Sequence, residues 1–136
     1  IFSAVSFTGA DDFKEELKKY NAQNGVIMTQ VVPSPTRSSL PIVVDARRIL
    51  GNRLNYVSLE GYIIGRMFLT LAQNIKGELT PATLMAATKG QRFDLGGLPL
   101  DFSNDNQGSD QVYITVIDQN EYEEINQEQL AALLLR

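Results

Sequence analysis

The chain has 136 residues, of which 43% are hydrophobic and 21% are charged, as is usual for one globular domain. Its net charge of -4 weighs against nucleic acid as a partner, because such binders usually carry a basic patch. It contains no Cys and no His, which excludes thiol nucleophiles, imidazole bases, Ser-His-Asp triads and Cys/His zinc sites built from this chain alone. We therefore expect a protein that is not an enzyme and that needs neither a metal nor a cofactor.

The first third of the chain reads as two strands separated by a helix. Residues 2–8 are apolar and favour a buried strand, which Gly9 ends. Asp11 or Asp12 can cap a helix that runs to about residue 20. Residues 25–32 form a second strand, uniformly apolar in its first half, and the proline-rich residues 33–36 form an extended connector.

The remainder of the chain is richer in helix. Capping residues, prolines, glycines and apolar periodicity together predict four helices and one further strand. The predicted helices span about residues 41–50, 59–76 with Ser58 as cap, 81–89, and 127–134 with Asn126 as cap. Residues 51–57 are a loop or short strand, residues 93–102 an irregular extended stretch, and residues 112–117 a clear strand.

This alternation of strands and helices predicts an α/β fold with a mainly parallel, Rossmann-like sheet and flanking helices. Such sheets bind ligands at the carboxyl ends of their strands, where the loops into the helices gather. In this chain that rule indicates two segments, residues 8–11 and residues 30–36.

The best candidate binding residues are Thr8, Gly9, Ala10 and Asp11, which follow the first strand and open a helix. Free backbone N–H groups at a helix start attract anions such as a ligand carboxylate. A side-chain carboxylate there can instead accept hydrogen bonds from a ligand ammonium. The alternative is that Asp11 or its neighbour Asp12 only caps the helix.

Other candidate constellations have simpler interpretations. Asp101, Ser103 and Asp105 alternate as in a calcium loop, but Asn106 replaces the required Gly and no Glu closes the loop, so a polar turn is favoured over a metal site. The Gly96-Gly97 pair does not open a helix and is not read as a phosphate loop. Pairs such as Asp45 with Arg48 and Glu60 with Arg66 have helical spacing and are expected to be salt bridges.

Four segments together carry a resemblance to a known family: FSAVSFTGADDF, GVIMTQVVPSP, YVSLEGYIIGRMF and FDLGGLPLDFSNDNQGSDQVYITVI. In this order and spacing they resemble the C-terminal portion of type I periplasmic binding proteins, specifically the branched-chain amino-acid-binding receptors of ABC transporters. The resemblance covers about residues 2–125. It implies two α/β lobes that close on a ligand by a hinge motion.

The resemblance also implies how residues 1–136 divide. Residues 1–32 and 97–136 would belong to the second lobe, and residues 38–95 to the first. Asp11 matches the acidic residue that holds the ligand ammonium in such receptors, with Thr8, Gly9 and Ala10 beside it. Most of the first lobe has no counterpart here, and the chain begins with Ile1. We therefore expect an incomplete two-lobe fold cut from a longer parent that carries a signal peptide.

The implied function is that of a periplasmic or extracellular receptor that captures an amino acid or similar solute for the membrane subunits of an ABC importer. The alternative is the extracellular sensory domain of a membrane signalling protein with the same fold. An enzyme with a Rossmann-like sheet is disfavoured, because the sequence lacks His, Cys and a G-x-G-x-x-G motif. Apolar surface left by the missing lobe predicts a homodimer or a swapped assembly of the isolated chain.

Overall fold

The computed structural model describes residues 2–135, which fold as two compact units. The first unit comprises the residues up to Arg37, the short piece Asn55–Val57, and the residues from Gln111 onward. The second unit comprises Ser38–Leu54 and Ser58–Asp110. Each unit contains buried apolar residues of its own.

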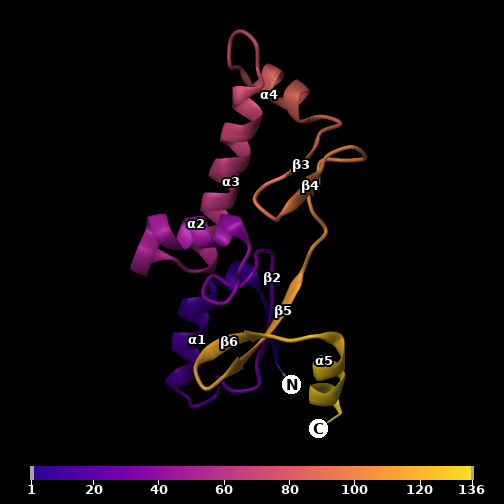
Figure 1. Cartoon of the computed structure of the whole chain (residues 1–136). Helices are drawn as coiled ribbons and strands as arrows, with labels where there is room; N and C mark the ends of the chain where they lie inside the picture. Colours follow the sequence, from indigo (N-terminus) through magenta and orange to yellow (C-terminus); the bar gives the residue numbers. More distant parts are fainter. Residues whose placement is uncertain (1, 136) are drawn as a thin grey trace. The chain divides into compact units, whose positions relative to one another are not determined.

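Figure 1 labels the helices and strands. The strands are β1 (Ser3–Val5), β2 (Ile27–Gln30), β3 (Arg92–Asp94), β4 (Pro99–Asp101), β5 (Tyr113–Asp118) and β6 (Glu121–Glu124). The helices are α1 (Ala10–Lys18), α2 (Pro41–Leu50), α3 (Tyr56–Gln73), α4 (Pro81–Thr88) and α5 (Gln127–Leu134). Two short 3₁₀ turns, Ser6–Thr8 and Gly51–Arg53, complete the set.

The first unit is built on a four-stranded sheet in the order β1-β2-β5-β6. Only β1 and β2 are parallel, with Ala4 opposite Met28. The pairs β2–β5 and β5–β6 are antiparallel. The α/β class is confirmed, but the expectation of a mainly parallel sheet is wrong for this unit. The reason is that β5 and β6 are joined by a tight hairpin, and only antiparallel strands allow such a connection.

The hairpin between β5 and β6 was not predicted from the sequence. Its turn places Gln119 at φ 45° and Asn120 at φ 69°, and two successive positive φ values are typical of a two-residue hairpin turn. The usual Asn-Gly or Asp-Gly signal is absent, because Gln119 and Asn120 occupy these positions instead. Asn tolerates this backbone region better than most residues, which accounts for its presence at the second position.

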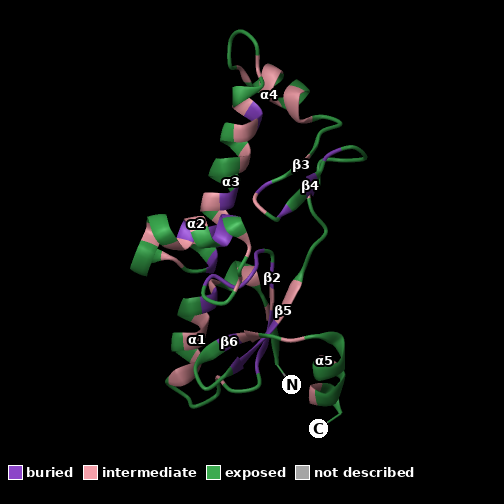
Figure 2. Cartoon of the chain, in the orientation of Figure 1, coloured by how far each residue is buried: buried purple, intermediate pink, exposed green. Residues whose placement is uncertain are grey.

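One face of this sheet forms the core of the first unit. The register places Met28, Thr115, Ile117 and Tyr122 on the same face, and all four are buried. Figure 2 shows the buried residues gathered on β2 and β5. Helix α1 lies on this face, because the Tyr122 hydroxyl donates a 2.6 Å hydrogen bond to the carbonyl oxygen of Ala10. The loop that begins α1 is thereby fixed to the sheet.

The second unit contains α2, α3 from Ser58 onward, α4 and the β3–β4 hairpin. The expected irregular stretch at residues 93–102 is in fact this hairpin. Gly96 and Gly97 turn its tip with φ values of 67° and 88°, and the Gly97 N–H donates to the Asp94 carboxylate at 2.7 Å. Gly96 also accepts a 3.0 Å hydrogen bond from the N–H of Ile42 at the start of α2. The Gly-Gly pair thus serves a tight turn packed against a helix.

Both units leave large apolar side chains in solvent. The exposed fractions reach 92% for Phe7, 89% for Leu135 and 79% for Phe2 in the first unit. In the second unit Met85 is 65% exposed and Leu69 is 53% exposed. Among residues 2–135 no helix combines the length and the apolar character needed to cross a membrane.

Candidate functional site

The candidate site lies at one edge of the four-stranded sheet. Because β1 and β2 are parallel, the loops that follow them emerge at the same edge. The start of β5 meets them there, since Tyr113 pairs with Gln30 at the end of β2. The loop before α1 and the connector after β2 are therefore brought to the same edge of the sheet, as the sequence predicted for residues 8–11 and 30–36.

The loop between β1 and α1 is ordered by local hydrogen bonds. The Thr8 hydroxyl donates to the carbonyl oxygen of Val5 at 3.0 Å, and the N–H of Gly9 donates to that of Ser6 at 3.1 Å. Gly9 has φ 73°, a conformation that a residue with a side chain rarely adopts, and it is the N-cap of α1. The chain therefore turns sharply into the helix at a glycine.

The capping role considered for Asp11 and Asp12 is wrong. The N-cap is Gly9, which has no side chain to cap with, and α1 already begins at Ala10. Both aspartates lie in the first turn, where a carboxylate is favoured by the positive end of the helix dipole. Their side chains are consequently not used to close the helix end, and no side chain makes a capping hydrogen bond there.

A small pocket of about 90 Å³ opens at this helix start. Its lining residues are Gly9, Ala10, Asp11, Asp12, Asn55, Tyr56 and Val57, all within the first unit. Two aspartates and a tyrosine are thus among the residues that line one space beside the first turn of α1. The pocket is well below the roughly 300–1,000 Å³ of a site that encloses a whole small molecule. It is large enough for one polar end of such a molecule.

Tyr56 forms the aromatic wall of the pocket. Its ring packs edge-on against Tyr122, with centroids 5.8 Å apart and planes at 83°. Burial raises the pKa of Tyr56 to about 12, a hydrogen bond with Ser34 opposes this rise, and the charges of Glu124 and Asp11 add to it. The phenol is therefore neutral at physiological pH and is able to donate a hydrogen bond.

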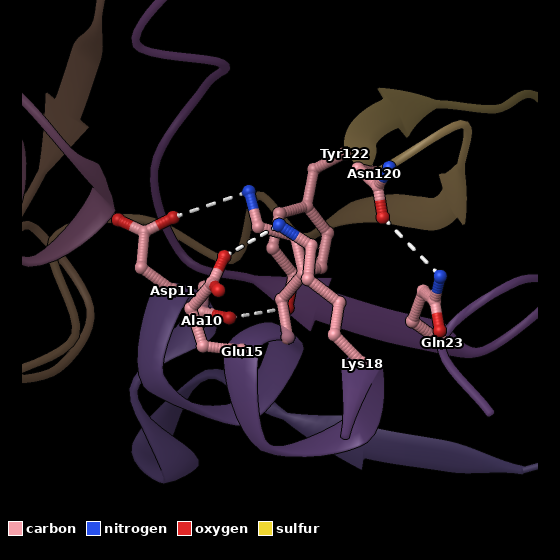
Figure 3. A network of polar contacts seen from close by, with 8 residues as sticks. Ala10, Asp11, Glu15, Lys18, Gln23, Asn120 and Tyr122 are labelled. Atoms are coloured by element: carbon pink, nitrogen blue, oxygen red, sulfur yellow. Dashed lines mark hydrogen bonds and ion pairs between the residues drawn. The ribbon is translucent and has the colours of Figure 1, made fainter. Parts of the chain in front are cut away.

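Tyr122, which packs against Tyr56, anchors the start of α1 through the bond to Ala10 that Figure 3 shows. Its hydroxyl holds the Ala10 carbonyl oxygen, and its own pKa is raised by burial, with the charge of Asp11 contributing. Asp11 also forms an ion pair of 3.7 Å with Lys14, one turn further along α1. Asp11, which lines the pocket, is thus ion-paired with a lysine of the same helix.

The predicted site residues have different positions. Gly9, Ala10 and Asp11 line the pocket together, whereas Thr8 is absent from the lining and binds Val5 instead. The lining also includes Asn55, Tyr56 and Val57, which come from a distant segment and were not predicted as site residues from the sequence. Only the tertiary fold brings Tyr56 to Asp11, so no local pattern in the sequence identified it among the five tyrosines.

A larger cavity, of about 560 Å³, lies in the second unit. It is lined by the end of α4, including Met85 and Lys89, and by residues 102–106 after β4. The aspartates of this loop serve the backbone: Asp101 accepts from the N–H of Ser103 at 2.8 Å and Asp105 from that of Gln107 at 2.7 Å. The loop is thus a hydrogen-bonded polar turn. Among residues 2–135 no group of three or more acidic residues forms a candidate metal site.

Comparison with solved structures shows what this fold is similar to. Over 95% of its length the chain matches a possible leucine/isoleucine/valine-binding protein from Rhodopirellula baltica SH 1, with 37% sequence identity and a TM-score of 0.85. It also matches an extracellular ligand-binding receptor from Verminephrobacter eiseniae ef01-2 over 79% of its length, with 27% identity and a TM-score of 0.66. A substrate-binding periplasmic protein from Ralstonia solanacearum, at 21% identity and a TM-score of 0.66 over 82% of this chain, shares the fold.

The three matching structures are of one kind, and this chain covers only part of each. All three are binding proteins, by name periplasmic or extracellular in two cases, and none is named as an enzyme. The chain spans 36%, 33% and 34% of their respective lengths, about a third in each case. No protein-family model and no curated protein matches the sequence.

These likenesses define the class of the chain. It has the α/β fold of part of a two-lobed ligand-binding receptor. The resemblance to type I periplasmic binding proteins of the branched-chain amino-acid-binding kind is confirmed.

Proposed function

We propose that the chain contributes one side of a ligand site in a periplasmic or extracellular receptor that captures an amino acid or a similar small solute. The observation that carries the proposal is the likeness, at 37% identity over 95% of the chain, to a possible leucine/isoleucine/valine-binding protein. The pocket at the start of α1 supports it, because its groups match the polar end of an amino acid. Capture of this kind makes and breaks no covalent bond.

The chemistry of the pocket fits an ammonium group best. The Asp11 carboxylate, half-exposed at 53% of its side chain, accepts hydrogen bonds from the ammonium, and each such charge-assisted bond is stronger than a neutral one. The Tyr56 ring supplies an aromatic surface beside it. A Cβ on Gly9 would make only an ordinary 3.7 Å contact with the Asp12 carboxylate, so the need for glycine here comes from its φ of 73°.

The size of the pocket agrees with a site that contacts only one part of the ligand. A space of about 90 Å³ holds an ammonium and its α-carbon but not a complete leucine. The remaining surface of the ligand is then covered by groups outside the first unit. We place residues 1–32 and 97–136 in the second lobe of the receptor and residues 38–95 in the first, with hinge closure trapping the ligand. The β3–β4 hairpin, which belongs to the second compact unit, makes residue 110 an alternative boundary.

The proposed physiological partners are the membrane subunits of an ABC importer. The importer role and the sensory role use the same ligand-binding step and differ in its consequence, which is transport of the ligand in one case and signalling in the other. Cells that lack the gene separate the two, because an importer receptor is required for uptake of its ligand and a sensory domain is not.

The proposal is tested by a thermal-shift screen of the complete protein that contains these residues, using the common amino acids and small aliphatic and aromatic acids. A ligand present at a hundredfold excess over its Kd stabilises the native state by about 2.7 kcal/mol, which is a clear rise in melting temperature. We expect branched aliphatic amino acids to give the largest rise. If no amino acid raises the melting temperature, the proposal is contradicted.

A further inference from the structure

Lys14 occupies an unusual position for a lysine on a surface helix. Only 12% of its side chain is exposed, whereas Lys18 and Lys19 of the same helix are 32% and 65% exposed. Lys18 pairs with Glu15 on the helix surface, as expected at this spacing. Lys14 instead points into the first unit, where its ammonium lies 5.6 Å from the centre of the Tyr122 ring.

A poorly hydrated ammonium requires partners that replace water. Lys14 has two: the Tyr122 ring, whose face attracts cations, and the Asp11 carboxylate at 3.7 Å. Tyr122 is fixed in turn by its hydrogen bond to Ala10 and by its contact with Tyr56. The position of the ammonium is therefore set by groups that also build the pocket.

Asp11 lines the pocket and Lys14 does not, so Lys14 reaches the carboxylate from outside the ligand space. This arrangement places a positive charge beside Asp11 whether or not a ligand is present. Asp12 is the other carboxylate in the lining, and Arg37 and Glu124 act on the pocket through Tyr56. Arg37 is itself paired with Glu123 at 2.8 Å, whereas Lys14 is paired with Asp11.

We propose that Lys14 is a positioning residue that acts as the resident counter-ion of Asp11 and thereby makes the site select zwitterionic ligands over purely cationic amines. The inference rests on the proposed function. An amine without a carboxylate is attracted by Asp11 and repelled by Lys14. The ammonium of a zwitterion is repelled by Lys14 in the same way, but its carboxylate is attracted by Lys14. The net repulsion by Lys14 is therefore smaller for a zwitterion than for an amine.

The test compares leucine with leucinamide, which has the same side chain but no carboxylate. Binding is measured by calorimetry on the complete protein at about pH 6, below the pKa of roughly 7.7 of a free α-amino group. We expect Lys14→Met to lower the Kd ratio of leucinamide to leucine by about three- to tenfold, as suits a partly screened charge. Lys14→Arg keeps the charge and should restore the ratio. Lys18→Met removes a lysine of the same helix that pairs with Glu15 and not with Asp11, so it is the matched control and should leave the ratio unchanged.

Equal ratios for Lys14→Met and Lys18→Met would overturn the inference while leaving the proposed function intact. Failure of the unaltered protein to bind any amino acid would overturn both. A second measurement needs no ligand: acetylation of lysines followed by mass spectrometry. We expect Lys14 to react several-fold more slowly than Lys19, and Asp11→Asn to reduce this protection. Reaction of Lys14 at the rate of Lys19 would contradict the counter-ion arrangement directly.

Discussion

At the scale of single residues, the site depends on contacts that join distant parts of the sequence. The Tyr122 hydroxyl and the Ala10 carbonyl are 112 positions apart, yet they form a buried 2.6 Å hydrogen bond. The position of Asp11, after a strand and at the start of a helix, was predictable from the sequence. Its partners Lys14 and Tyr56 were not, because neither helical spacing nor residue type distinguishes an inward-pointing lysine or a pocket tyrosine from surface ones.

Loss of the Tyr122 hydroxyl is expected to destabilise the first unit. Tyr122→Phe keeps the ring but leaves the buried Ala10 carbonyl without its donor, which costs about 1–2 kcal/mol of unfolding free energy. Urea denaturation of the variant measures this loss. Tyr20→Phe is the matched control, because Tyr20 is 73% exposed, and it should change stability by less than about 0.5 kcal/mol. Equal effects of the two substitutions would contradict the anchoring role of Tyr122.

The buried phenols also predict the behaviour of the chain at high pH. The pKa of Tyr56 is raised from 10.0 to about 12, so the folded state holds this proton more tightly than the unfolded state does. The stability gained in this way is complete below about pH 10 and is lost as the pH rises toward 12. Tyrosinate absorbance should therefore show an ionisation step near pH 12, and Tyr56→Phe should reduce the amplitude of that step. Simultaneous ionisation of all tyrosines in the folded chain would contradict the burial of Tyr56.

At the scale of elements, strong local signals gave correct boundaries and weak ones did not. Pro41 and Asn126 mark helices that begin where predicted, and α2 ends at Leu50 as expected. The long helix begins at Tyr56, before the predicted cap Ser58, whose hydroxyl donates to the carbonyl oxygen of Arg53 instead. Strand β6 has three glutamates among its four residues and follows a turn without glycine, so its pairing with β5 depends on the tertiary structure. The antiparallel part of the sheet was missed for the same reason.

The β3–β4 turn offers a test of how an element is held in the second unit. Gly96 and Gly90 have similar φ values of 67° and 76°, so alanine costs a similar conformational strain at both. A Cβ on Gly96 would lie 3.0 Å from the backbone nitrogen of Ile42, whereas a Cβ on Gly90 meets nothing within 4 Å. Gly96→Ala should therefore lower the unfolding free energy by roughly 1–3 kcal/mol more than Gly90→Ala, measured by chemical denaturation. Equal losses would contradict the packing of the turn against α2.

At the scale of the whole molecule, the chain corresponds to about a third of each receptor or binding protein that it resembles. The α/β class and the kinship with these proteins were predictable, because four sequence segments in order carry that information. Residues 33–36 were predicted to be an extended connector, and the first compact unit has a boundary close to them, at Arg37. The identity of the ligand could not be predicted, since the pocket in the first unit has room for only one polar end of a small molecule.

The exposed apolar side chains predict self-association of the isolated 136-residue chain. Phe7 is 92% exposed and Phe2 is 79% exposed beside the edge strand β1, and such surface drives association in water. Sedimentation velocity over a range of concentrations should detect dimers or larger species. Phe7→Ser should reduce association and change the unfolding free energy by less than about 0.5 kcal/mol. A single monomeric species at every concentration would contradict this prediction.

In the proposed function, the start of α1 holds the ammonium of an amino-acid ligand through Asp11. Calorimetric titration of the complete protein with its best amino acid, comparing Asp11→Asn with Asp12→Asn, tests it most directly. Both residues line the pocket, and both substitutions remove one carboxylate at nearly constant size. We predict that Asp11→Asn weakens binding by about 2–4 kcal/mol, or thirtyfold or more, and that Asp12→Asn has a much smaller effect. Unchanged affinity in Asp11→Asn would contradict the assignment of the site.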